Sequence, residues 1–151
     1  MIVSYAGIIV IDMAKLHSNA LGRRAALSYL WPTLLYAVGI FGLSSIPDLH
    51  GPELPVIPFD KAAHVLEYTG FALLVTRSAS YLFAKSSSRS QYLISWFIVA
   101  AFGAVDELYQ SVVPGRTPDV VDFLADICGG GFAILLIWLW RRRQNGRQRL
   151  K

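Results

Sequence analysis

Long apolar stretches separated by short groups of charged residues limit how this chain can fold more than any other feature. Four stretches, at about residues 25–46, 62–83, 91–108 and 118–140, reach the length of a membrane-spanning helix. Such a helix needs about 20 residues to cross a hydrocarbon core of about 30 Å. The third stretch could continue to Val113, before the helix-breaking pair Pro114-Gly115. The sequence therefore predicts an all-α polytopic membrane protein, a bundle of four transmembrane helices.

The composition argues against two other classes of protein. Hydrophobic residues make up 54% of the 151-residue chain and charged residues only 16%, too few to cover a soluble helical bundle. The net charge of +4 could suggest nucleic acid, but the basic residues flank apolar stretches and do not form a stripe with aromatic residues. We therefore expect no nucleic-acid partner. A single cysteine, Cys128, excludes a disulfide framework.

The positions of the basic residues predict the orientation. If the chain crosses four times, nearly all of them fall on one side: Lys15, Arg23, Arg24, Arg77, Lys85, Arg89, and the tail residues Arg141, Arg142, Arg143, Arg147, Arg149 and Lys151. By the positive-inside rule that side is the cytoplasm. We therefore expect a multi-pass protein of the cytoplasmic membrane with both termini inside. Residues 141–151 form a basic cytoplasmic tail that orients the protein or contacts anionic lipid.

Residues 1–24 precede the first predicted span and support two interpretations. The apolar piece Met1–Ile11 is too short to cross a membrane and lacks the features of a secretory signal. It is either an upstream extension, with the true start at Met13, or an interfacial segment. Residues 25–140 then form the transmembrane domain.

Ionisable residues gather at the predicted outer ends of three helices. Helical spacing stacks His64 and Glu67 on one face, and does the same for Asp122 and Asp126. The fourth-helix stripe continues into Gly129, Gly130 and Ala133, small residues that allow close helix contact. Ionisable groups within membrane spans usually have a function. We therefore predict a catalytic group of His64, Glu67, Asp106, Glu107, Asp122 and Asp126, with Lys61, Gln110, Arg116 and Tyr68 as ligand-binding residues.

Several roles stay open for these residues. Asp60 and Asp119 could instead be helix N-caps, Lys61 an interfacial anchor, and Tyr68 a core residue. Glu67 or Glu107 could act as a general base. Lys61 and Arg116 could pair with the acids and neutralise part of their charge, or hold a phosphate or carboxylate. His64 with the acids could hold a divalent cation, so the cofactor is undetermined.

The ordered motifs resemble those of the VanZ-like family of bacterial membrane proteins. They are Ser44-Ser45-Ile46-Pro47, Asp60-Lys61 with His64 and Tyr68, Asp106-Glu107 with Gln110, Pro114-Gly115-Arg116, and Asp122 with the glycine run. The likeness covers residues 25–140 and departs at Asp126, where an asparagine is expected. It implies work at the cell envelope, because the family is associated with resistance to the glycopeptide teicoplanin.

Three functions follow from these observations. The first is a protein that binds or acts on a lipid-linked or other anionic cell-wall precursor. The second is a small transporter or ion-coupled protein, although the inner halves of the helices carry no ionisable relay. The third is a non-catalytic membrane adaptor. Whether a reaction is catalysed, and the oligomeric state, stay open.

Overall fold

The computed structural model describes the backbone of residues 5–47 and 59–148, and the side chains of residues 22–47 and 59–147. Within these ranges the chain forms four α-helices: α1 (Tyr5–Ser44), α2 (Phe59–Leu82), α3 (Ser88–Gln110) and α4 (Val120–Gln148). The all-α prediction is confirmed for this part of the chain. The predicted tail residues Arg149 and Lys151 lie outside it, as does His50.

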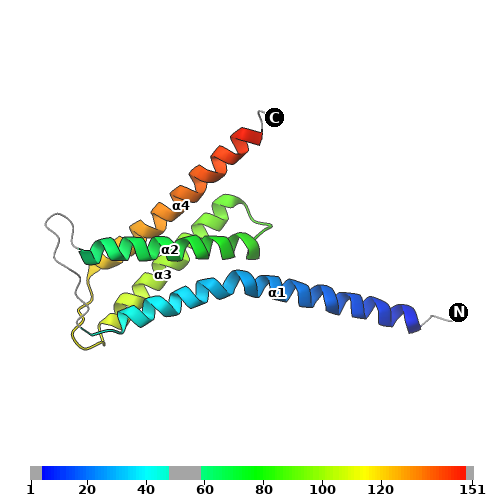
Figure 1. Cartoon of the computed structure of the whole chain (residues 1–151), viewed down its shortest axis with the longest axis horizontal. Coiled ribbons are helices and arrows are strands. Elements are labelled where there is room, and N and C mark those ends of the chain that lie inside the picture. Colours follow the sequence, from blue (N-terminus) through cyan, green and yellow to red (C-terminus); the bar gives the residue numbers. More distant parts are fainter. Residues whose placement is uncertain (1–4, 48–58, 149–151) are drawn as a thin grey trace.

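Two helices are longer than their predicted apolar spans. α1 begins at Tyr5 instead of near Ala25, and α4 continues through Arg141 to Gln148. Arginine and glutamine have high helix propensity, so a helix can continue where apolar sequence ends. Pro32 lies inside α1, where it removes one backbone donor, and Figure 1 shows that α1 changes direction along its length.

The turns between helices use ordinary capping. The Ser87 hydroxyl accepts a hydrogen bond from the Ser90 backbone N–H at 3.2 Å and caps the start of α3. Gly115 has a φ of 77°, the left-handed conformation that glycine adopts without strain, in the turn between α3 and α4. α3 ends at Gln110, so it does not extend to Val113, and Pro114-Gly115 lies in the turn that follows.

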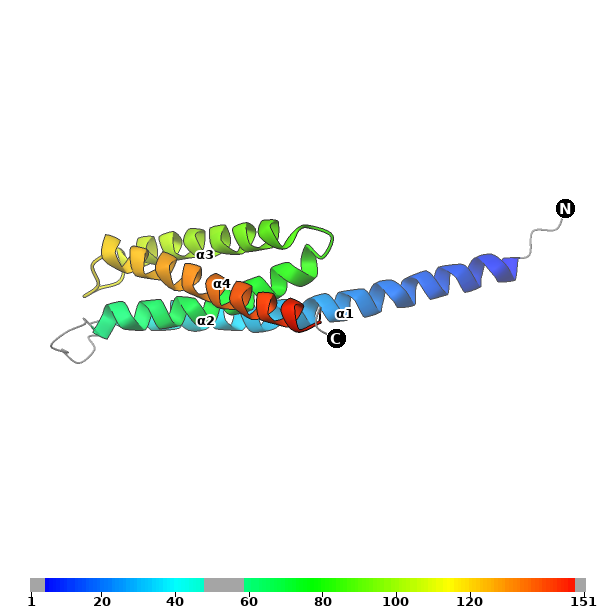
Figure 2. The ribbon, with the colours of Figure 1, turned by 90° about the horizontal axis from the view of Figure 1, so that it is seen from above.

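The helices form a bundle in which α2 contacts all the others (Figures 1 and 2). The end of α1, the start of α2, the end of α3 and the start of α4 lie together at one end, called the site end below. The start of α1 and the end of α4 lie toward the opposite end, called the terminal end. The three groups of ionisable residues are consequently carried to the same end of the bundle.

Small residues bring α2 and α4 into close contact. A Cβ atom added to Gly129 would lie 2.5 Å from the backbone oxygen of Val65, and one added to Gly130 would lie 2.9 Å from Cγ1 of Val99. The Thr69 hydroxyl also donates to the Gly129 carbonyl at 3.1 Å. The prediction that these glycines face neighbouring helices is confirmed.

In the part of the chain that the structure describes, three helical segments are long and apolar enough to cross a membrane: Gly22–Ser44, Ser88–Gln110 and Val120–Arg147. Their large apolar side chains lie outward, as with Phe97 and Leu108, each 71% exposed. At 24 residues α2 has the length, about 36 Å at 1.5 Å per residue, but it carries Asp60, Lys61, Glu67 and Arg77. It also supplies most of the buried core, including Tyr68, Phe71 and Val75. The fourth crossing and the side on which the termini lie stay predictions.

Candidate functional site

Lys61 joins the starts of α2 and α4. Its ammonium nitrogen lies 2.6 Å from Asp119 Oδ2, 2.5 Å from Asp122 Oδ1 and 3.2 Å from Asp60 Oδ2. Asp119 lies in the turn before α4, and the hydrogen bond from Lys61 holds the pKa of its carboxyl below the ordinary value. Lys61, which the sequence also allowed as an interfacial anchor, therefore forms ion pairs with three carboxylates.

The two predicted caps differ in the structure. Asp119 Oδ1 accepts a hydrogen bond from the Val121 backbone N–H at 2.8 Å, so it caps α4 as predicted. Asp60 does not precede its helix, because α2 begins at Phe59. It lies in the first turn, where a carboxylate interacts favourably with the helix dipole.

His64 is held by a carboxylate buried between the helices. Its Nδ1 lies 2.8 Å from Oδ1 of Asp126, whose side chain is 0% exposed. With Nδ1 donating to Asp126, Nε2 is the ring nitrogen left for another partner. Such a carboxylate–histidine pair fixes the ring and raises the basicity of the free nitrogen, whether that nitrogen is to bind a metal or accept a proton. Asp126 is thus a hydrogen-bond acceptor here, at the position where the family resemblance suggested asparagine.

Three helices bring ligand atoms together beside this pair. One donor atom each from His64, Glu107 and Asp122 lies within 4.8 Å of the others. Glu107 is buried, and its Oε2 accepts a hydrogen bond from the Asp119 backbone N–H at 2.9 Å. Its Oε1 is buried without a hydrogen-bond partner among the described residues. One nitrogen and carboxylate oxygens form a donor set that suits Mn²⁺ or Zn²⁺.

Asp106 is a neighbouring buried carboxylate that faces α1. Its Oδ2 accepts hydrogen bonds from the Ser44 hydroxyl at 2.8 Å and from Gln110 Nε2 at 3.2 Å. Its side chain is 1% exposed, and Oδ1 has no partner in the described part of the chain. Gln110 thus positions Asp106 in this structure, and its role in binding a ligand stays a prediction.

Glu67 and Tyr68 follow His64 on α2. The Glu67 side chain is half-buried, and its backbone carbonyl accepts a hydrogen bond from Tyr36 Oη at 3.1 Å. Tyr68 is 0% exposed, packs against Phe71 and Phe102, and lies parallel to the His64 ring. Its hydroxyl has no hydrogen-bond partner among the described residues. Tyr68 therefore packs in the core directly below the cluster.

Arg116 does not join the carboxylates as the sequence suggested. Its Nε donates to the Ile46 carbonyl at 3.1 Å and its Nη2 donates to the Leu43 carbonyl at 3.2 Å. The last carbonyls of a helix have no partner within the helix and carry partial negative charge, so a guanidinium is stabilised there. The expected pairing of Arg116 with the acids is corrected to a cap on α1.

Sequence reasoning gave no role to two residues near this site. Ser44 was noticed only within its motif, yet its hydroxyl binds Asp106. Tyr109 meets Ser45, with 2.8 Å between their hydroxyl oxygens. Both contacts join residues more than sixty positions apart in the chain. The only signal for these contacts in the sequence was the position of Ser44, a polar residue at the end of an apolar stretch.

Comparison with known proteins places the chain in a family. A family model described as VanZ/LLP1 matches residues 11–141. Neither the curated proteins nor the solved structures give a match.

Proposed function

This chain belongs to the VanZ/LLP1 family, and from that premise we propose that its polar cluster binds a lipid-linked or cell-wall precursor. In this proposal the protein crosses the cytoplasmic membrane four times with both termini inside. The site end of the bundle then faces outward, where such precursors are used.

The observation that carries the proposal is the meeting of His64, Glu107 and Asp122, whose ligand atoms lie within 4.8 Å of one another. They come from three different helices and face the same point near the ends of α2, α3 and α4. Buried carboxylates are costly unless they are paired or used. The Oε1 atom of Glu107 is buried without a partner in the described structure, which supports a role for this carboxylate in binding a ligand.

The charge of the cluster favours a bound cation. Lys61 already contacts three carboxylates and His64 contacts Asp126, while Arg116 caps α1 away from the acids. A bare phosphate would meet an excess of negative charge. A divalent cation at His64, Glu107 and Asp122 removes this repulsion and offers open coordination positions to phosphate oxygens. We therefore propose that phosphorylated precursors bind through such a cation.

The same residues define what chemistry is available. Nε2 of His64, oriented through Nδ1 by Asp126, is suited to accept a proton or to hold the cation. A bound cation would polarise a phosphoryl oxygen or lower the pKa of a bound water. Hydrolysis or transfer at a phosphoryl group is the reaction class that fits this set, if the site is catalytic.

The experiment measures binding in nanodiscs that hold the purified full chain. Mn²⁺ alone is titrated first, and then a short-chain polyprenyl phosphate with Mn²⁺ or with a chelator. Glu107→Gln and Asp122→Asn should each weaken Mn²⁺ binding about tenfold or more, the scale on which metal-site changes act. Asp60→Asn is the matched control, because it removes one carboxylate at the rim, where the side chain is 53% exposed.

Two results would contradict the proposal. One is polyprenyl phosphate binding that is equal in the wild type and in Glu107→Gln, with or without the chelator. The other is an ion flux, driven by Mn²⁺, into sealed vesicles that contain the protein, while no polyprenyl phosphate binds. This result would favour the transporter hypothesis. In cells, the same two variants should lose any glycopeptide resistance while still accumulating in the membrane.

A further inference from the structure

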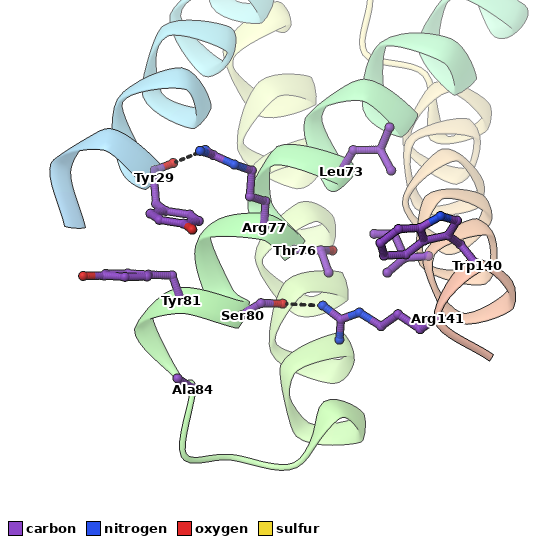
Figure 3. A pocket seen from close by; sticks show the side chains of 10 residues that line it. Tyr29, Leu73, Thr76, Arg77, Ser80, Tyr81, Ala84, Trp140 and Arg141 are labelled. Atoms are coloured by element: carbon purple, nitrogen blue, oxygen red, sulfur yellow. Dashed lines mark hydrogen bonds between the residues drawn. The ribbon is translucent and has the colours of Figure 1, made fainter. Parts of the chain in front are cut away.

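A second polar feature lies in a groove at the terminal end of the bundle, away from the acidic cluster. It has a volume of about 560 Å³ and is bordered by α2, the last part of α4 and Tyr29 of α1 (Figure 3). This volume is typical of a small-molecule or lipid-headgroup site. The groove uses no residue of the cluster proposed above, so the two sites are independent.

Two arginines border the groove from opposite sides. Arg77 lies over the Tyr29 ring, 4.3 Å from its centroid, and its Nη1 reaches the Ser28 and Tyr29 carbonyls at 3.5 and 3.4 Å. Arg141 Nη2 donates to the Ser80 hydroxyl at 2.9 Å (Figure 3). Within the described ranges neither guanidinium forms an ion pair with a carboxylate. Each therefore keeps its charge and several of its five N–H donors for an anion.

A buried hydroxyl on the groove wall also lacks a partner. Thr76 is 1% exposed, lines the groove, and has no hydrogen bond at Oγ1 among the described residues. Buried hydroxyl groups nearly always have a partner. Serine and threonine in helices commonly donate to the carbonyl four residues earlier, as Thr69 does at 2.6 Å to Val65. The free hydroxyl of Thr76 points to a polar ligand atom.

The remaining walls are apolar and lie on the lipid-facing side of the bundle. Leu73 and Trp140 line the groove and are 41% and 61% exposed, and Ile137 of α4 also lines it. Tryptophan collects at membrane interfaces because its ring is amphipathic. The groove thus combines an apolar wall with a basic rim, which matches the acyl chain and phosphate of one lipid.

We infer that this groove binds an anionic phospholipid of the leaflet at the terminal end. The phosphate lies between Arg77 and Arg141, with Thr76 as a further donor, and an acyl chain lies along Leu73 and Ile137. Arg142, Arg143 and Arg147 follow Arg141 on α4 and strengthen the preference for negatively charged headgroups.

The test compares lipids added to the purified full chain in a neutral detergent. The probes are phosphatidylglycerol, phosphatidylcholine and inorganic phosphate, and bound lipid is counted by native mass spectrometry. The wild type should retain phosphatidylglycerol in preference to phosphatidylcholine. Arg77→Gln with Arg141→Gln should reduce this preference about tenfold or more. The matched control is Arg23→Gln with Arg89→Gln, which removes the same charge from exposed helix positions outside the groove and the basic end of α4, and should change it little.

A second variant separates lipid binding from charge and from folding. Leu73→Trp keeps every charge but fills the apolar wall, and should reduce retention of phosphatidylglycerol while helix content by circular dichroism stays unchanged. The inference is overturned if both arginine pairs behave alike, or if Leu73→Trp binds as the wild type does. It is also overturned if inorganic phosphate displaces the lipid at equal concentration, because the groove would then be a site for soluble anions.

Discussion

Gly129→Ala tests the contact that brings the acidic cluster together. The added Cβ would lie 2.5 Å from the Val65 backbone oxygen and 3.1 Å from the Thr69 backbone nitrogen. Backbone atoms of a packed helix cannot rotate away as a side chain can. α2 and α4 must therefore separate by close to 1 Å to restore ordinary contact distances.

The magnitude follows from two opposing effects. Overpacking of this kind costs about 1–3 kcal/mol, whereas alanine is favoured over glycine inside a helix by about 1 kcal/mol. The hydrogen bond from Thr69 to the Gly129 carbonyl, 3.1 Å long, is lost as the helices separate. We expect a net loss of about 1–2 kcal/mol in the free energy of unfolding. Because His64 adjoins Val65 and Asp126 lies one turn before Gly129, their hydrogen bond should also weaken.

The assay is unfolding of the purified chain in mixed micelles by increasing sodium dodecyl sulfate, followed by circular dichroism, with Mn²⁺ binding measured on the same samples. Gly131→Ala is the matched control on the same helix, since its Cβ would lie 3.9 Å from the nearest atom, Trp96 Nε1. It should be neutral or stabilising. If Gly129→Ala unfolds at the same detergent fraction as Gly131→Ala, the close contact between α2 and α4 is refuted.

Three further predictions concern topology, acid stability and the α1 cap. Cysteines introduced at His50 and Arg116 should react with an impermeant thiol reagent in intact cells, and one at Arg89 should not; labelling at Arg89 would exclude the four-span arrangement. Because the pKa of Asp119 is lowered in the fold, its pair with Lys61 stabilises above the ordinary carboxyl value of 3.8 and is lost as pH falls below it. Thermal midpoints should thus drop between pH 5 and pH 3 more in the wild type than in Asp119→Asn, and equal drops would exclude this pair as a source of acid sensitivity. Arg116→Gln should destabilise the chain by about 1 kcal/mol in the same unfolding assay, whereas an unchanged midpoint would rule out a stabilising cap.

The length of the apolar stretches was enough to predict the helices, and the spacing of small and acidic residues was enough to predict the inward face of α4. Asp122, Asp126, Gly129 and Ala133 recur at helical spacing, and the structure buries Asp126 and Ala133 completely. The helix ends were less predictable, because α1 and α4 continue into polar sequence where hydropathy gives no signal. A membrane span is predicted from the length of an apolar stretch, whereas a helix ends where a capping residue or a proline stops it.

The sequence predicted which residues share the site, but not which of them pair with one another. Stacked charges on three helices implied a shared location, but they did not show that Asp126 would bind His64 or that Lys61 would bind Asp119 and Asp122. Arg116 shows the limit most clearly. Its charge suggested the acids, whereas it binds the carbonyls of Leu43 and Ile46 at and just after the end of α1, which have no signature in the sequence.

The cap on α1 has a consequence for the order in which the protein matures. Arg116 is synthesised 70 residues after Ile46, whose carbonyl it binds, so this contact can form only after α2 and α3 have been made. The hydrogen bond from the Ser44 hydroxyl to Asp106 likewise forms only after α3 has been made. A chain truncated before Arg116 would therefore lack the contact that joins the turn after α1 to the turn between α3 and α4.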